Sequence, residues 1–128
     1  MSCYPAAAAC ASVAGSSPDQ GYALVDRTDA ALASAVAQQP VSAGMMASPL
    51  LMLYNGGVMT RRCGPVVNHG VLVVGYGTWR DGTPYWKVKN SFGKWWGMNG
   101  YLLLERGEEP HRPGGACGIE LMASYPVM

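Results

Sequence analysis

Charge is scarce in this chain, and that scarcity excludes several classes of partner. Charged residues make up only 13% of the 128 residues, hydrophobic residues make up 49%, and the formal net charge is +1. Such a balance offers no electrostatic attraction for nucleic acid or for an anionic membrane surface. It also argues against intrinsic disorder, which goes with high charge and low hydrophobicity. We therefore expect a folded domain with no nucleic-acid or membrane partner, part of whose surface another molecule covers.

Long apolar runs are missing as well. No stretch reaches the roughly 18 apolar residues that a membrane-spanning helix needs. Residues 6–11 are apolar but have no basic flank, so no targeting signal is expected in this chain. The length suits one domain. The segment after Met1 is typical of the middle of a domain, which suggests a partial gene product.

Cysteine pairs with the spacing of a metal site are also absent. The cysteines are Cys3, Cys10, Cys63 and Cys117, and none belongs to a Cys-x-x-Cys pair. A zinc site through Cys63 and His69 would lack a second pair of ligands, so no metal is expected. Disulfides are the favoured alternative, and they indicate an oxidising compartment.

The pattern of the remaining chain predicts several β-strands and one helix. Thr28 is a candidate N-cap for a helix over Ala30–Gln39, which Pro40 would end. Strands are expected over residues 21–26, 41–46, 58–60, 69–78, 84–90 and 100–106. The apolar segment 49–54 is ambiguous, and residues 108–115 are typical of a polar loop. We expect a surface arm over residues 1–20 and one domain over residues 21–128, with an antiparallel, barrel-like sheet.

His69 and Asn90 stand at the two ends of the predicted hairpin. The Asp81-Gly82 turn signal lies between them, so folding back would bring the two side chains together. Imidazole suits a general base because it titrates near neutral pH. An amide oxygen can accept the imidazole N–H and orient the ring without adding charge. Singly, each residue would be an ordinary histidine or turn residue, but together they indicate two thirds of a cysteine-protease triad.

The motifs around this pair and several others along the chain belong to one common sequence pattern. They are Asn68–Gly77, Tyr85–Gly93, Trp96-Gly97 and Asn99-Gly100-Tyr101, with shorter matches at Tyr4-Pro5, Gln39–Ser42, Tyr54–Val58, Cys117–Ile119 and Tyr125-Pro126. Together they resemble the C-terminal half of papain-family cysteine peptidases, with a cathepsin L-like character. The resemblance covers about the whole chain and is weakest before Gly21.

The resemblance implies roles for the residues that match. His69 matches the catalytic histidine, and Asn90 matches the asparagine that orients it. Cys63 and Cys117 match a disulfide of this domain. Cys10 matches a cysteine whose partner lies in the other domain of the family.

Substrate-binding roles follow from the same resemblance. Trp96 resembles a tryptophan that lines the leaving-group side of the cleft. Val67, Asn68, Gly70 and Met122 match positions around the main specificity pocket and its approach. Met122 would make the floor of this pocket apolar. The expected substrate therefore carries Leu, Phe or Val one residue before the acyl residue of the scissile bond.

Departures from the family pattern limit what the chain can do by itself. Phe92 stands where the family has a tryptophan that shields the histidine–asparagine hydrogen bond. The larger departure is a missing N-terminal domain, which would carry the nucleophilic cysteine at a helix N-terminus and the glutamine of the oxyanion hole. Cys3 and Cys10 lie in an Ala-rich arm with no helix start after them, so neither is expected to replace that nucleophile.

The resulting expectation is an α+β, mostly β fold: the antiparallel, barrel-like right-hand domain of the papain fold, with one short helix. It would be the C-terminal catalytic half of a papain-like cysteine endopeptidase, inactive alone and without a cofactor. Implied partners are a peptide or protein substrate, the missing N-terminal papain-like domain and protein inhibitors, in a lysosomal or secreted location. Alternatives are a non-catalytic module that binds peptides or inhibitors, and a β-barrel interaction domain unrelated to proteases.

The missing domain would leave an apolar face uncovered. Candidates for that face are Met45, Met46, Leu50, Leu51, Trp95 and Trp96. Exposed apolar area beyond a few hundred Å² usually marks a missing partner or an aggregation risk. We therefore expect the isolated chain to self-associate.

Overall fold

The fold was analysed in a computed structural model, which describes residues 21–60, 67–107 and 114–127. Within those ranges the strands are β1 (Gly21–Leu24), β2 (Val41–Met45), β3 (Val58–Met59), β4 (His69–Thr78), β5 (Pro84–Lys89), β6 (Tyr101–Glu105) and β7 (Ser124–Val127). The helices are α2 (Asp29–Val36) and the 3₁₀ helices η1 (Pro49–Leu53) and η2 (Ala116–Gly118). No helix in this part of the chain is long and apolar enough to cross a membrane.

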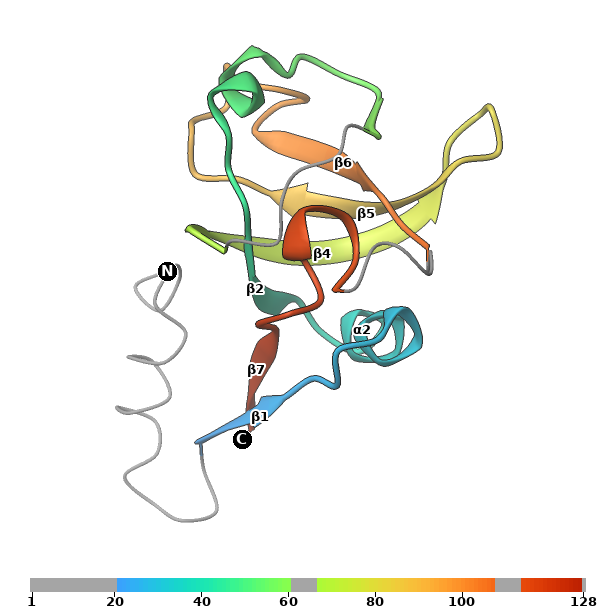
Figure 1. The fold of residues 1–128 in the computed structure, drawn as a ribbon, viewed down its shortest axis with the longest axis vertical. Coiled ribbons are helices and arrows are strands. Elements are labelled where there is room, and N and C mark those ends of the chain that lie inside the picture. Colours follow the sequence, from blue (N-terminus) through green and yellow to red (C-terminus); the bar gives the residue numbers. More distant parts are fainter. Residues whose placement is uncertain (1–20, 61–66, 108–113, 128) are drawn as a thin grey trace.

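The strands form one sheet of seven, in the order β1-β7-β2-β4-β5-β6-β3 (Figure 1). Neighbours are antiparallel except β3 and β6, which run parallel. In the described ranges no pairing joins the edge strands β1 and β3, so the sheet is open. The mostly β, α+β fold with one α-helix is confirmed. The barrel-like sheet expected from the sequence is open in these ranges and does not close into a full barrel.

The β4–β5 hairpin is the centre of the sheet. Its register runs from Leu72 opposite Lys89 to Thr78 opposite Pro84, with an irregularity between Val73 and Gly75. The turn is closed by Asp81, whose side-chain oxygen accepts from the Thr83 N–H at 3.0 Å. That bond is the main reason that the pKa of Asp81 lies below its ordinary value. The predicted Asp-Gly turn is thus confirmed, because an Asp side chain can take the place of a backbone acceptor.

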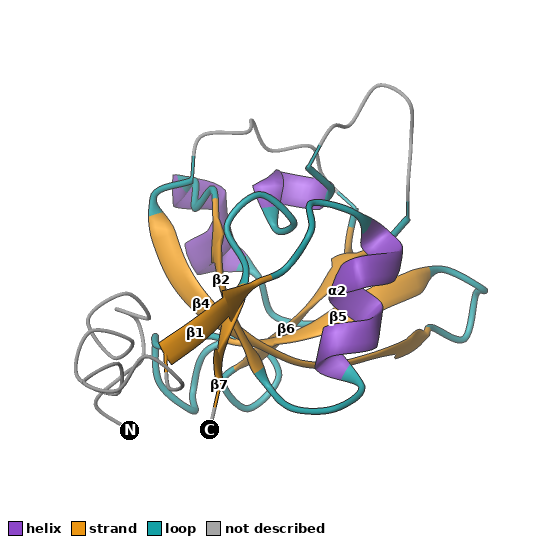
Figure 2. Cartoon of the chain, turned by 90° about the horizontal axis from the view of Figure 1, so that it is seen from below, coloured by secondary structure: helices purple, strands orange, loops and turns teal. Residues whose placement is uncertain are grey.

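Helix α2 lies against one side of the strands (Figure 2). Thr28 caps its start, since the Ala31 N–H donates to Thr28 Oγ1 at 3.1 Å. The helix ends at Val36, before the predicted end at Gln39, because the Gln38 N–H donates to the Ala35 carbonyl only three residues earlier, which breaks the α-helical pattern before Pro40. Leu32 and Val36 point into the core and are fully or almost fully buried.

An ion pair holds the start of α2 to the end of β6. Arg106 contacts both carboxylate oxygens of Asp29, with the shortest distance 3.0 Å. The same guanidinium lies over the rings of Tyr76 and Trp86 at 4.8 and 4.9 Å. Trp86 is fully buried and anchors the core between the sheet and the helix. The cluster therefore joins α2, β4, β5 and β6.

The ambiguous apolar segment before Tyr54 is the 3₁₀ helix η1, and it closes onto the loop that follows β5. The Trp96 indole N–H donates to the Leu51 carbonyl at 3.1 Å, and Tyr54 packs on Trp96 with ring centroids 5.4 Å apart. This contact buries Leu51 and Trp96, and Met45 is buried in β2. The expectation that these three side chains form an uncovered face is therefore wrong, whereas Trp95 is 80% exposed.

Candidate active site

The hairpin brings His69 and Asn90 together as the sequence predicted. His69 is the first residue of β4, and Asn90 follows the last residue of β5. His69 Nε2 lies 2.6 Å from Asn90 Oδ1. On its other side β4 pairs with β2, with Met45 opposite His69, so strand β2 holds the histidine backbone.

Contacts other than the one with the imidazole hold Asn90 in position. Its backbone N–H donates to the Gly100 carbonyl at 3.0 Å, and its side chain is almost fully buried. The Ser91 N–H donates to Asn90 Oδ1 at 2.8 Å, which sets the orientation of the amide. Because Oδ1 can only accept, His69 Nε2 carries the hydrogen of this bond. The neutral imidazole then has Nδ1 as its acceptor, free to take a proton from another group.

An aromatic column supports the imidazole. Phe92 lies beside His69 with ring centroids 5.3 Å apart, and Trp96 meets Phe92 edge to face at 5.2 Å. Phe92 thus keeps an aromatic ring next to the hydrogen bond where the family has a larger one. Trp96 is only 2% exposed, so it offers little surface to a ligand and packs behind Phe92. Its role as a wall of the cleft stays a prediction, and the exposed tryptophan beside it is Trp95.

Tyr54 completes this column at its far end. Its hydroxyl donates to the Gly57 carbonyl at 2.6 Å and accepts from the Leu103 N–H at 3.1 Å. Burial raises the pKa of Tyr54 above its ordinary value, and the Leu103 bond opposes that shift in part. Nothing in the local sequence pattern signals this tie between η1 and β6.

Asn68 holds the backbone just before the histidine. Its Oδ1 accepts from the Ala47 N–H at 2.8 Å, and its Nδ2 donates to the Ala47 carbonyl at 3.4 Å. The Asn68 N–H donates to the Met45 carbonyl at 3.1 Å. These bonds continue the contact between β2 and β4 past the end of the ladder, and so limit the movement of His69.

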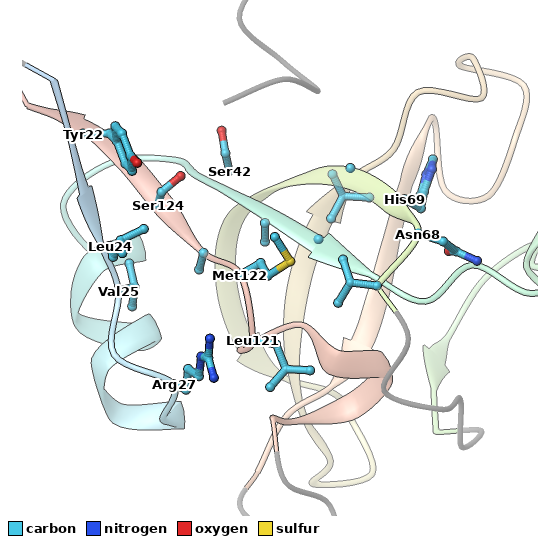
Figure 3. A pocket seen from close by; sticks show the side chains of 16 residues that line it. Tyr22, Leu24, Val25, Arg27, Ser42, Asn68, His69, Leu121, Met122 and Ser124 are labelled. Carbon is cyan, nitrogen blue, oxygen red and sulfur yellow. The ribbon is translucent and has the colours of Figure 1, made fainter. Parts of the chain in front are cut away.

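A pocket of about 620 Å³ opens beside His69 (Figure 3). The predicted pocket residues Val67, Asn68, Gly70 and Met122 all line it. Met122 projects into it, with 64% of its surface exposed. Its other walls come from β1, β2, β4 and β7, from the segment between β1 and α2, and from the segment before β7. The lining residues that sequence reasoning missed include Tyr22, Leu24, Arg27, Ser42, Leu121 and Ser124.

Cys117 is disulfide-bonded and 2% exposed. Its predicted partner Cys63 lies outside the described residues, as do Cys3 and Cys10, so the pairing stays a prediction. In ranges 21–60, 67–107 and 114–127, no group of three or more His, Cys, Asp or Glu side chains is placed to hold a metal ion.

Comparisons with known proteins agree with this geometry. The profile of the papain family of cysteine proteases matches residues 3–127. The chain is 51% identical over 98 residues to thiol protease SEN102 of Hemerocallis sp., covering 76% of this chain and 27% of that protein. It is 44% identical over 130 residues to the senescence-specific cysteine protease SAG39 of Oryza sativa subsp. indica, covering 97% of this chain and 38% of that protein.

Solved structures give the same result. The bromelain protease of Ananas comosus, in complex with the E64 inhibitor, superposes with a TM-score of 0.79 at 36% identity, over 84% of this chain and 50% of that one. The proform of the ragweed pollen cysteine protease Amb a 11 gives a TM-score of 0.78 at 43% identity, over 84% of this chain and 30% of that one. The chain thus spans half or less of the length of these relatives. Its sequence, its fold and its His69–Asn90 pair show that it belongs to the papain family of cysteine proteases.

Proposed function

We propose that this chain is the catalytic half of a papain-like cysteine endopeptidase that supplies the general base and its orienting amide. The proposal rests on one observation: His69 Nε2 is 2.6 Å from the oxygen of a buried amide whose direction is already set. A surface histidine has no need of such a partner. A base that must accept a proton at Nδ1 and return it does need a fixed ring.

Hydrolysis of a peptide bond then divides between this chain and a segment that bears the nucleophile. His69 Nδ1 takes the proton of a cysteine thiol, and the resulting thiolate attacks the scissile carbonyl. The imidazolium next donates that proton to the leaving amine. Asn90 keeps the ring in one orientation throughout and adds no charge. The 128 residues contain no cysteine in the family's nucleophile motif. The thiol is therefore proposed to belong to the complementary half of the enzyme.

The pocket beside His69 is proposed to receive a substrate side chain. Val67 and Met122 give it apolar walls, and Gly70 has no side chain to narrow it. A substrate with Leu, Phe or Val one residue before the acyl residue fits these walls, because apolar surface removed from water there favours binding.

Partners and location follow from the same proposal. A protein inhibitor of the cleft would contact both halves, so its binding is expected to need the complementary half. The disulfide at Cys117 supports an oxidising location, lysosomal or secreted. A second candidate is a non-catalytic module that binds peptides, which is favoured by a pocket built entirely from this chain.

The test is complementation. The 128-residue chain alone should not cleave a dipeptidyl fluorogenic substrate under reducing, mildly acidic conditions. Turnover that E-64 blocks should appear when the nucleophile-bearing half of a relative is added, and His69→Ala should abolish it.

Other outcomes would contradict the proposal. E-64-sensitive turnover by the chain alone that disappears on mutating Cys3 or Cys10 would refute the half-enzyme reading. A folded complex of the two halves with no turnover would favour the binding module instead.

A further inference from the structure

The pocket beside His69 has an unequal distribution of charge. His69 lies at one end, Arg27 lies near the other, and apolar side chains separate them (Figure 3). No acidic residue is among the described residues that line it. A pocket intended only for apolar side chains needs no guanidinium, so Arg27 calls for a separate explanation.

Backbone hydrogen bonds on either side of Arg27 hold this segment near the pocket, and Arg27 has no carboxylate partner in the described ranges. It lies in the short loop between β1 and α2. The Val25 N–H donates to the Ala123 carbonyl at 2.9 Å, and the Thr28 N–H donates to the Asp26 carbonyl at 2.8 Å. The ion pair in these ranges joins Arg106 to Asp29. The Arg27 side chain is exposed, and so it is available to a ligand.

The composition of the walls decides which ligand would use it. Leu121 and Met122 lie in the wall beside Arg27 (Figure 3). They can cover the methylene groups of a side chain that enters from the His69 end. A carboxylate at the tip of that side chain would meet the guanidinium, which binds carboxylates through two parallel N–H donors.

We propose that Arg27 is a specificity-determining residue that lets this pocket accept a glutamate side chain in addition to apolar ones. The inference rests on the proposed function, because it requires that the pocket receive a substrate side chain. It adds a charge-dependent preference to the apolar selectivity that Val67, Gly70 and Met122 provide.

The test measures binding by NMR on the isotopically labelled 128-residue chain. The probes are capped dipeptides, N-acetyl-X-Ala-amide, with X as Leu, Glu or Gln, so that no terminal charge interferes. Glu should bind about two- to fivefold more tightly than its isostere Gln at low salt, the size expected for an exposed ion pair. That advantage should largely disappear in 0.5 M salt, because exposed charges are screened.

Matched variants assign the effect to Arg27. Arg27→Gln should remove the preference for Glu over Gln, whereas Arg27→Lys should keep part of it. Arg80→Gln is the control, since Arg80 is exposed in the β4–β5 turn and stacks on Trp79 away from the pocket. The amide spectrum of each variant shows whether its fold is intact.

The outcomes separate this inference from the proposed function. Equal binding of Glu and Gln, or a preference that survives in Arg27→Gln, overturns the role of Arg27 alone. If no probe shifts the amides around Gly70 and Met122, the pocket does not bind peptide side chains. In that case both the substrate pocket of the proposed function and the role of Arg27 fail.

Discussion

Asn90 combines a buried amide with a hydrogen bond to a ring that must stay in place. Replacing it by Ala leaves His69 Nε2 without its acceptor and lets the imidazole turn. In the complemented enzyme we expect Asn90→Ala to lower kcat/KM by about tenfold to a hundredfold, a part of the 10²- to 10⁴-fold that a positioned general base supplies. Ser91→Ala is the control, because Ser91 acts on Asn90 through its backbone N–H. Unchanged kcat/KM in Asn90→Ala would show that the amide does not orient the base.

Tyr54 makes the stability of the fold depend on pH in the alkaline range. Burial raises the pKa of Tyr54 above its ordinary value of 10.0, so the folded state holds the phenolic proton more tightly than the unfolded state. The resulting stabilisation is complete below the unfolded pKa and is lost as the pH rises through the folded pKa. Urea unfolding between pH 7 and 11 should show this fall in the free energy of unfolding.

The Tyr54→Phe variant separates the proton from the hydrogen bonds. It should lose about 1 to 2 kcal/mol at pH 7, since the Gly57 and Leu103 backbone groups lose their partner. Between pH 7 and 11 its free energy of unfolding should also fall by less than that of the wild type. Tyr22→Phe, at a half-exposed tyrosine, is the control and should change neither the stability at pH 7 nor its fall at high pH. An equal fall in the free energy of unfolding of wild type and Tyr54→Phe at high pH would be evidence against this role for Tyr54.

At the scale of elements, the loop between β5 and β6 carries the support for the active-site pair. Gly97 in this loop has a φ of +60°, and a Cβ added there would lie 2.7 Å from the Tyr101 carbonyl oxygen and close to the Tyr54 ring. Gly97→Ala should therefore destabilise the fold by about 1 to 3 kcal/mol. It should also loosen the edge-to-face contact of Trp96 with Phe92. Urea unfolding measures the first effect, and broadening of the His69 ring signals in NMR measures the second.

Gly21 provides the matched control for that substitution. A Cβ added there meets nothing within 4 Å, so Gly21→Ala should leave stability within about 0.5 kcal/mol of the wild type. Equal stability of the two variants would mean that the loop can adjust at Gly97 without strain.

At the scale of the whole molecule, the disulfide at Cys117 ties η2 to another part of the chain. Pairing with Cys63 would close a loop of about 54 residues, worth roughly 4 kcal/mol in the chain-entropy model. It would also link the segment before β4, which leads to the pocket residues Val67 and Asn68, to η2. Peptide mapping without reduction should find Cys63 joined to Cys117, and reduction should lower the denaturation midpoint. A bond from Cys117 to Cys3 or Cys10 would contradict the pairing.

The hairpin and its site follow from the sequence because they depend on short-range patterns. Alternation of apolar residues, the Asp81-Gly82 turn and the placement of His69 and Asn90 at its ends are sufficient to bring the pair together. The N-cap at Thr28 is a local signal of the same kind. The predicted end of α2 lies too far along the chain, because the shift to a three-residue turn at Gln38 is not visible in residue spacing.

Which surfaces are buried and where the pocket lies depend on contacts between distant segments. Strand β1 pairs with β7, so Arg27 and Met122 come to the same pocket from opposite ends of the described chain. Trp96 is buried because η1 offers it the Leu51 carbonyl, a contact that neither segment signals alone. Local backbone preferences act within a few residues and can be read from spacing. Burial, in contrast, depends on pairings between distant segments, and these exist only after the whole sheet has formed.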